Sequence, residues 1–157
     1  MNFFLINIML AFIWATVTGS FSAGNLVIGF GLGYLILLMV QPVYKSNYAA
    51  NFWRAIYLFI YFLKELVLSS IRVAIDVMRP GFNMKSGVVS IPLDAKTDLE
   101  ITMLANMITL TPGTLTLDVS DDRTKLYIHA MYIDTDVEAV RRDVKNGMEK
   151  RILRVLR

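Results

Sequence analysis

Residues 1–44 contain no aspartate, glutamate, lysine, arginine or histidine. Two apolar runs, about residues 2–18 and 25–41, fill most of this region, and a turn rich in glycine and serine separates them. An apolar run of roughly 17–25 residues can cross a bilayer as a helix, and the first run is at the short end of that range. Most charged residues follow position 78, so the two halves are predicted to face different solvents.

The composition is typical of a membrane protein and limits the chemistry. Apolar residues make up 55% of the chain and the mean hydropathy is +0.52, both high for a soluble protein. Cysteine is absent, which excludes disulfides and thiolate metal sites. The single histidine, His129, leaves no histidine cluster, so neither a metal nor a cofactor is predicted. The first apolar run lacks the basic start and processing site of a secretory signal and is interpreted as a retained membrane helix.

The second apolar run carries Gly29 and Gly33, which form a GxxxG spacing. Small residues at this spacing let membrane helices approach closely, so this face is expected to pack on a neighbouring helix. The alternative is that glycine is simply common in membrane helices. Pro42 is predicted to end this helix.

A third helix is predicted over residues 52–78, and its polar residues form one stripe. They recur at spacings of three, four or seven: Arg54, Tyr61, Glu65, Ser69, Arg72, Asp76 and Arg79. The helix either lies in the membrane interface with this stripe in water, or spans the membrane with the stripe against another protein. Pro80-Gly81 is predicted to end it.

Four charged residues of this helix are candidates for function: Lys64, Glu65, Arg72 and Asp76. Charges at membrane depth are costly, so they tend to be paired or functional. Arg72 and Asp76 are four residues apart and can pair on one helix face. The stripe is therefore a candidate for lining a polar ion route or for docking another subunit. The alternative is that the charges of an interfacial helix are simply solvated.

Beyond residue 79 the pattern predicts a small α+β domain of order β-α-β-β-α. Residues 87–93 read as a strand, and Thr97 with Glu100 forms a capping box that opens a helix to about residue 108. Residues 114–120 and 125–133 are predicted to form a hairpin. Thr135 with Glu138 forms a second capping box before a last helix to about residue 156. The chain is thus divided into a membrane region, residues 1–79, and a cytoplasmic domain, residues 80–157.

The distribution of basic residues predicts the orientation. The net charge is +3, and the basic residues lie at Lys45, Arg54 and in the C-terminal region. Cytoplasmic segments carry an excess of lysine and arginine, so the C-terminal domain is predicted to be cytoplasmic, without nucleic-acid binding. Two or three membrane crossings remain compatible with this charge pattern, and they differ in the side on which the N-terminus lies.

No enzymatic motif is present: the sequence contains no phosphate-binding loop, nucleophile elbow or HExxH. The acidic residues of 118–122 lack the glycine and the distal glutamate of an EF-hand loop and are interpreted as a solvated hairpin turn. His129 lies in a predicted strand, where a surface or core role is the default. An enzyme is therefore not expected.

The most distinctive segment runs from Asn106 to Ser120 and reads NMITLTPGTLTLDVS. Physically, Pro112-Gly113 predicts a tight turn between a helix and a strand. Thr109, Thr111 and Thr114 offer hydroxyls that can satisfy the backbone at the helix end.

This threonine-rich segment, preceded by paired apolar helices and a third helix of mixed charge, resembles the E subunit of the multisubunit cation/proton antiporters of the Mrp (Mnh) type. The resemblance covers essentially the whole chain. It implies an accessory subunit of a hetero-oligomeric complex in a bacterial plasma membrane, where lipid and the other antiporter subunits are its partners. The complex is expected to exchange Na⁺, and sometimes K⁺ or Li⁺, for H⁺. No residue here matches an established catalytic or ion-binding residue of that family.

Two functions are therefore expected to compete. The first is a structural and assembly subunit of a secondary antiporter, which could also line a cation route. The second is a membrane-anchored ligand-binding or regulatory module, in which the helices are only an anchor.

Overall fold

The computed structural model describes residues 3–44, 48–79, 85–133 and 137–157. These residues form two compact units, Met1–Trp53 and Arg54–Arg157, which are described separately. The predicted division after residue 79 concerns which solvent each region faces, and it stays a prediction.

The first unit is a helical hairpin. α1 (Phe3–Thr18) and α2 (Ala23–Tyr44) pack along each other, and the first turn of α3 (Tyr48–Met78) completes the unit. The side chain of Asn25 stabilises the turn between α1 and α2. Its Oδ1 accepts a hydrogen bond from Trp14 Nε1 at 3.0 Å, and its Nδ2 donates to Thr18 Oγ1 and to the Ser20 carbonyl, each at 2.6 Å. Gly19 has φ of +67°, which permits the sharp exit from α1.

Gly29 and Gly33 of α2 face α1. A Cβ atom at Gly29 would lie 3.0 Å from the carbonyl oxygen of Ala11, and a Cβ atom at Gly33 would overlap the side chain of Asn7. Asn7 is fully buried, and its Nδ2 donates to the Tyr48 hydroxyl at 3.0 Å. The two glycines thus allow a buried polar side chain of α1 to lie directly against the backbone of α2.

Two predicted helix boundaries were wrong. α2 continues through Pro42 to Tyr44, because a proline close to a helix end removes only one backbone hydrogen bond and membrane helices tolerate this loss. α3 begins at Tyr48, four residues before the predicted start at Phe52. The polar linker composition misled the prediction, since the Tyr48 ring lies 5.9 Å from the ring of Tyr34 and stabilises an additional helical turn. The predicted stop at Pro80-Gly81 and the linker residue Lys45 lie outside the described residues.

The second unit contains the predicted β-α-β-β-α order. It consists of β1 (Gly87–Pro92), α4 (Asp98–Leu110), β2 (Thr114–Val119), β3 (Lys125–Ala130) and a C-terminal helix. The sheet is antiparallel with strand order β1-β3-β2, and β2 and β3 form the expected hairpin. Pro92 ends an edge strand, where its missing N–H costs no hydrogen bond of the ladder. β3 ends three residues earlier than predicted, at Ala130.

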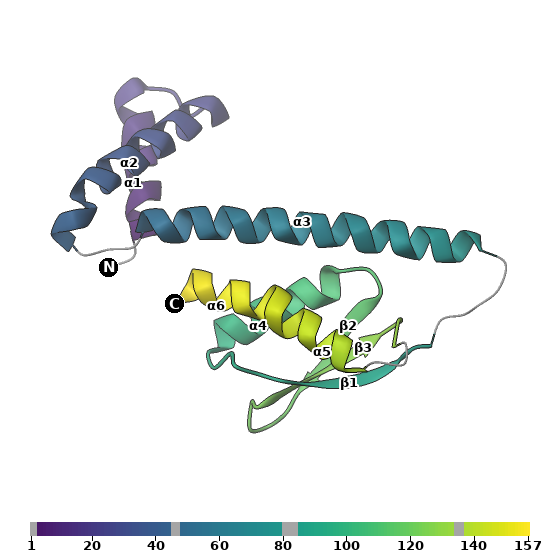
Figure 1. Ribbon diagram of the computed structural model, residues 1–157. Coiled ribbons are helices and arrows are strands. Elements are labelled where there is room, and N and C mark those ends of the chain that lie inside the picture. Colours follow the sequence, from purple (N-terminus) through teal and green to yellow (C-terminus); the bar gives the residue numbers. More distant parts are fainter. Residues whose placement is uncertain (1–2, 45–47, 80–84, 134–136) are drawn as a thin grey trace. The chain divides into compact units, whose positions relative to one another are not determined.

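The core of the second unit lies between the sheet and its helices. α4 and the C-terminal helix cover one face of the sheet, and α3 runs along the other side of this helical layer (Figure 1). Ile91, Leu126 and Ile128 point from the strands into the core and are fully buried. Leu58 of α3 is only 3% exposed and belongs to the same cluster, so α3 packs as part of this unit.

The C-terminal helix is less regular than predicted. α5 (Val137–Arg142) leads into a π-helical segment, η1 (Asp143–Glu149), which is followed by α6 (Lys150–Leu156). Such π segments are rare and are found mostly at functional or tightly packed places. An apolar periodicity of 3.6 could not reveal this change in winding. Thr135 of the second predicted capping box lies outside the described residues.

Two buried carboxylates anchor the loop between β1 and α4. The predicted capping box of Thr97 and Glu100 is present in full, and Glu100 also accepts hydrogen bonds from Arg157 Nε at 2.9 Å and Nη2 at 3.1 Å. Glu149 is 1% exposed and accepts from the backbone N–H groups of Asp94 and Ala95 at 2.6 and 2.9 Å. Hydrogen bonds therefore connect the loop to α4 through Glu100 and to the C-terminal helix through Glu149.

Candidate functional site

The polar stripe of α3 faces this chain's own α/β domain. Leu58, Tyr61, Glu65 and Ser69 are buried or half-buried on that side of the helix, whereas most residues of the opposite side are exposed. The middle of the stripe therefore packs against the chain's own domain, whereas Arg54, Arg72 and Arg79 are exposed.

The docking of α3 combines apolar and cationic contacts. The guanidinium of Arg151 in α6 stacks on the Tyr61 ring, 3.9 Å from its centroid. Arg54 Nη1 donates to the carbonyl oxygen of Arg154 at 3.3 Å, near the start of α3. At the other end, Val73 lies next to the turn that contains Gly113. These contacts run over most of the length of α3.

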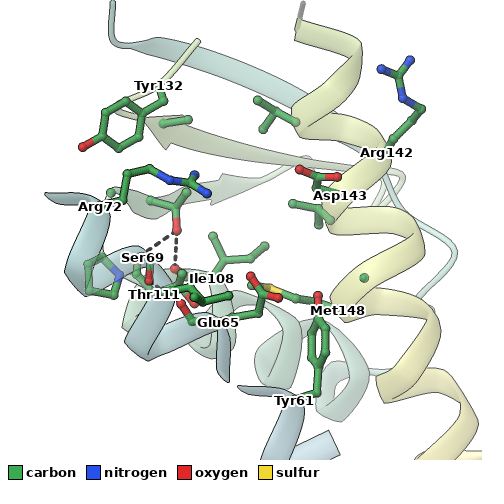
Figure 2. Close-up of a pocket in the computed structure, with 18 of the residues that line it drawn as sticks. Tyr61, Glu65, Ser69, Arg72, Ile108, Thr111, Tyr132, Arg142, Asp143 and Met148 are labelled. Carbon is green, nitrogen blue, oxygen red and sulfur yellow. Dashed lines mark hydrogen bonds between the residues drawn. The ribbon is translucent and has the colours of Figure 1, made fainter. Parts of the chain in front are cut away.

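Between α3 and the domain lies a pocket of about 560 Å³. Its walls come from three places: α3, the turn between α4 and β2, and the π-helical segment η1 (Figure 2). A volume of this size is in the range of small-molecule sites, which is roughly 300–1,000 Å³.

The pocket brings together features that are far apart in the sequence. Of the predicted residues, Glu65 and Arg72 line it, as do Thr111, Pro112, Gly113 and Thr114 of the threonine-rich segment. Gly29 and Gly33 belong to the hairpin unit, and the other four predicted residues lie outside the lining. Lys64 is exposed on α3, and Asp76 pairs with Arg79 at 4.0 Å instead of with Arg72. Asn106 lies on α4, and Thr109 Oγ1 accepts from the backbone N–H of Thr116 at 3.2 Å.

The hydroxyls of the threonine-rich segment are committed to the backbone. Thr111 Oγ1 donates to the Met107 carbonyl at 2.8 Å, and Thr114 Oγ1 donates to the carbonyls of Ile108 at 2.7 Å and Thr111 at 2.9 Å. Gly113 has φ of +92°, a conformation that side-chain-bearing residues rarely adopt. The segment thus forms a rigid wall whose shape follows from its sequence.

Three charged residues of the pocket, Glu65, Asp143 and Arg72, form no ion pair with another described residue. No lysine or arginine described by the structure lies within 4.0 Å of the carboxylates of Glu65 or Asp143, and no carboxylate lies that close to Arg72. Figure 2 shows these three groups directed into the same space, whereas Arg142 points away from it.

Tyr132 marks the end of the pocket nearest Asp76. The Asp76 carboxylate, together with burial of the ring, raises the pKa of the Tyr132 hydroxyl above its ordinary value, and Arg72 opposes this effect. The hydroxyl makes no hydrogen bond of acceptable geometry in the described residues, so its interaction with Asp76 is a close electrostatic contact.

Sequence reasoning missed the second wall of the pocket. Asp143, Asn146 and Arg151 line it from the C-terminal helix, where they looked like ordinary solvated residues. The one local signal was Gly147, an unfavourable residue within a helix. The structure explains it, because a Cβ atom there would lie 2.7 Å from the Tyr61 hydroxyl.

Comparison with known proteins gives one family. The family model described as "Na+/H+ ion antiporter subunit" (MNHE) matches residues 7–155. The chain is 40% identical over 154 residues to the E subunit of the Na⁺/H⁺ antiporter of Bacillus subtilis, and the match covers 98% of this chain and 97% of that protein. It is 37% identical over 152 residues to the E subunit of the Na⁺/H⁺ antiporter of Alkalihalophilus pseudofirmus, and the match covers 96% of each.

Two solved complexes contain similar chains. One chain of the Mrp complex from Dietzia sp. is 30% identical, with a TM-score of 0.52, and the match covers 66% of this chain and 96% of that one. One chain of the membrane-bound sulfane sulfur reductase, an archaeal respiratory membrane complex, is 27% identical with a TM-score of 0.64, and the match covers 99% and 98% of the two chains.

Proposed function

Because the chain belongs to the family of Na⁺/H⁺ ion antiporter subunits, we propose that it is an assembly subunit whose third helix fixes its α/β domain at the membrane surface. The chain is an accessory subunit of a multisubunit Na⁺/H⁺ antiporter, and its partners are the other subunits of that complex. The proposal concerns how it is placed in the membrane and what its charged residues do.

One observation carries the proposal: the two sides of α3 have opposite character. The side opposite the α/β domain exposes a continuous apolar surface, formed by Phe59, Ile60, Leu63, Val67, Ile71, Ile75 and Met78. Such a helix suits the membrane interface, with its apolar side in the acyl region and its polar side away from it.

The docked length of α3 argues against a third crossing. Contacts with the domain begin with the hydrogen bond of Arg54 and continue to Val73, and from Leu58 onwards they reach Asp76, which lies beside Tyr132. At 1.5 Å per residue this stretch is roughly 27 Å long, close to the thickness of the hydrocarbon core. No part of α3 long enough to cross the bilayer is therefore free of the water-facing domain.

The hairpin then provides the membrane anchor. Among the described helices, residues Ala23–Val40 of α2 are long and apolar enough to span a membrane, and α1 is a shorter apolar helix. With the N-terminus inside, two crossings return the chain to the cytoplasmic side, where the lysine and arginine residues that follow the hairpin satisfy the positive-inside rule. The membrane would be the bacterial plasma membrane.

In this arrangement the charged residues of α3 have a docking role. Glu65, Arg72 and Asp76 lie on or beside the side that packs on the domain, whereas Lys64 is exposed and lies outside the pocket. Gly29 and Gly33 keep α1 and α2 in close contact.

Cysteine labelling tests the topology. The chain contains no cysteine, so Ala50→Cys and Arg79→Cys each place a single thiol on this subunit, near opposite ends of α3. In intact cells producing the whole complex, a membrane-impermeant maleimide should label neither thiol, and after permeabilisation it should label both. If only one of the two were labelled in intact cells, α3 would cross the membrane and the proposal would be wrong.

A candidate additional role of the assembly subunit, an ion route along the stripe, has a separate test. Glu65→Gln and Asp76→Asn remove charge without changing size. If the stripe only docks the domain, vesicles with either variant should keep Na⁺-dependent proton exchange in proportion to the amount of assembled complex. Loss of exchange at normal assembly would favour the ion route. Deleting the whole chain should abolish exchange under either function.

A further inference from the structure

The pocket between α3 and the α/β domain has no assigned ligand, and we propose that it binds a small zwitterion, an anionic group beside an ammonium group. The membrane source of this chemistry is the phosphoethanolamine headgroup of a phospholipid. That source rests on the proposed placement of α3 at the membrane surface, whereas a free zwitterion could enter without it.

The anionic end of the ligand is assigned to Arg72. Its guanidinium has no carboxylate within 4.0 Å among the described residues, and Figure 2 shows it directed into the pocket. A guanidinium offers several N–H donors in a planar fork that matches phosphate and carboxylate oxygens.

The cationic end is assigned to Glu65 and Asp143, which come from two different walls. Both carboxylates lie within electrostatic range of the Tyr61 hydroxyl, as does the Arg151 guanidinium, so the three groups approach the same part of the pocket. Neither carboxylate has a cationic partner within 4.0 Å in the described residues, which leaves both able to accept from a ligand ammonium group. A ligand ammonium group placed between them would make charge-assisted hydrogen bonds to both.

The hydroxyls around the pocket favour the ammonium end of the ligand. Ser69 Oγ donates to the Glu65 carbonyl at 2.6 Å, and Thr114 Oγ1 donates to the Ile108 carbonyl at 2.7 Å. Because each hydroxyl has used its only proton, it can offer only lone pairs to a ligand. The lining is therefore rich in acceptors apart from its arginines, as a zwitterion requires and as a simple anion does not.

The charges of Glu65 and Arg72 stay apart because both residues lie at fixed positions on α3. Glu65 and Arg72 are seven residues apart, two helical turns, or roughly 10 Å along the axis. The regular rise of the α-helix fixes this distance. A ligand with two opposite charges can meet both groups, whereas the two side chains cannot neutralise each other.

The test uses the intact antiporter complex, purified in detergent and measured by native mass spectrometry. Three probes are compared: phosphatidylethanolamine, phosphatidylglycerol, which lacks the ammonium group, and glycerophosphoethanolamine, which lacks acyl chains. The variants are Arg72→Gln and Asp143→Asn, and the matched control is Lys64→Gln on the exposed part of the same helix. Co-purification of the other subunits verifies that each variant is assembled.

We expect Arg72→Gln and Asp143→Asn each to weaken phosphatidylethanolamine binding about tenfold, equivalent to about 1.4 kcal/mol, and Lys64→Gln to leave it unchanged. Phosphatidylglycerol should bind more weakly than phosphatidylethanolamine to the wild type, and Asp143→Asn should reduce this preference. Competition by glycerophosphoethanolamine would identify a soluble zwitterion as a sufficient ligand, and its absence would identify the lipid.

Equal binding of phosphatidylethanolamine by the wild type and by both pocket variants would overturn the assignment. So would equal binding of the two lipids by the wild type, since a site for phosphate alone needs no carboxylates. These outcomes are independent of the cysteine labelling. A third crossing of α3 would remove the lipid source but would not change the response of a soluble zwitterion to Arg72→Gln.

Discussion

The hydroxyl of Tyr61 on α3 occupies the space in which a side chain at Gly147 would begin. The distance from a Cβ atom built there to Tyr61 Oη would be 2.7 Å, and the Tyr61 ring is held from its face by the guanidinium of Arg151. The glycine in the π-helical segment and the tyrosine of the polar stripe are thus two halves of one contact, which closes the pocket at this end.

This contact predicts a non-additive pair of substitutions. Gly147→Ala should gain up to about 1 kcal/mol from helix propensity, but it must displace the Tyr61 hydroxyl. In a Tyr61→Phe background the hydroxyl is absent, so Gly147→Ala should be more stabilising there than in the wild type. Thermal unfolding of the four full-length proteins in detergent measures the difference. An identical effect in both backgrounds would mean that α3 does not pack as described.

The α1–α2 hairpin should be sensitive to one glycine and tolerant of another. Gly33→Ala places a methyl group against the buried side chain of Asn7, whereas a Cβ atom at Gly31 would meet nothing within 4 Å. We expect Gly33→Ala to destabilise the hairpin by about 1–3 kcal/mol through overpacking, and Gly31→Ala to be nearly neutral. The melting temperature and the yield of assembled complex measure this. Partial rescue of Gly33→Ala by Asn7→Ala would show that the overlap is the cause.

The buried carboxylate of Glu149 should be important for stability. It accepts two backbone N–H groups and pairs with Lys145 at 2.8 Å, so Glu149→Ala leaves three donors without this acceptor. We expect a loss of about 2–4 kcal/mol in the free energy of unfolding. The control is Glu138→Ala, which removes a more exposed pair with Arg141 and should cost less than about 1 kcal/mol. Similar losses in both variants would contradict the role of burial.

The stability of the α/β domain should depend on pH through Glu100. The Arg157 guanidinium, followed by the backbone N–H groups of Lys96 and Thr97, lowers the pKa of Glu100 from 4.5 to about 2. A depressed carboxyl pKa contributes stability that is fully present above pH 4.5 and is lost as the pH falls towards 2.

Glu100→Gln should therefore be less stable than the wild type at pH 6, and the difference should narrow at pH 3. Thermal unfolding of the full-length protein in detergent at both pH values provides the measurement. A difference that stays constant between these pH values would show that ionisation of Glu100 does not contribute.

Local signals predicted the parts of the fold that depend on neighbouring residues. The capping box of Thr97 and Glu100 was confirmed because its two hydrogen bonds connect residues only three positions apart. The β2–β3 hairpin was confirmed as well, since strand alternation and the turn are both local. The boundary at Pro42 was wrong because a helix tolerates proline close to its end, and the boundary at Phe52 was wrong because ring packing of Tyr48 outweighed the polar composition of the linker.

The sequence indicated only some of the residues that form the pocket. Glu65 and Arg72 stood out as charges on an apolar helix, and Thr111–Thr114 stood out as an unusual turn, but nothing local indicated that they meet. Asp143 and Arg151 gave no signal, because charged residues on a terminal helix are ordinary. Gly147 is an unfavourable residue within a helix, and its reason is a contact with a residue 86 positions earlier in the chain.

The amino-acid sequence alone determined the partition between apolar and charged regions, the order of helices and strands, and the resemblance to one family of antiporter subunits. These follow from hydrophobicity, periodicity and short-range hydrogen bonding, which any segment carries by itself. Only the tertiary structure decided which way the polar stripe of α3 points, where the π-helical segment forms and which charges share a pocket. Those outcomes depend on how surfaces distant in sequence fit together, and the free energy of that packing is a property of the folded chain.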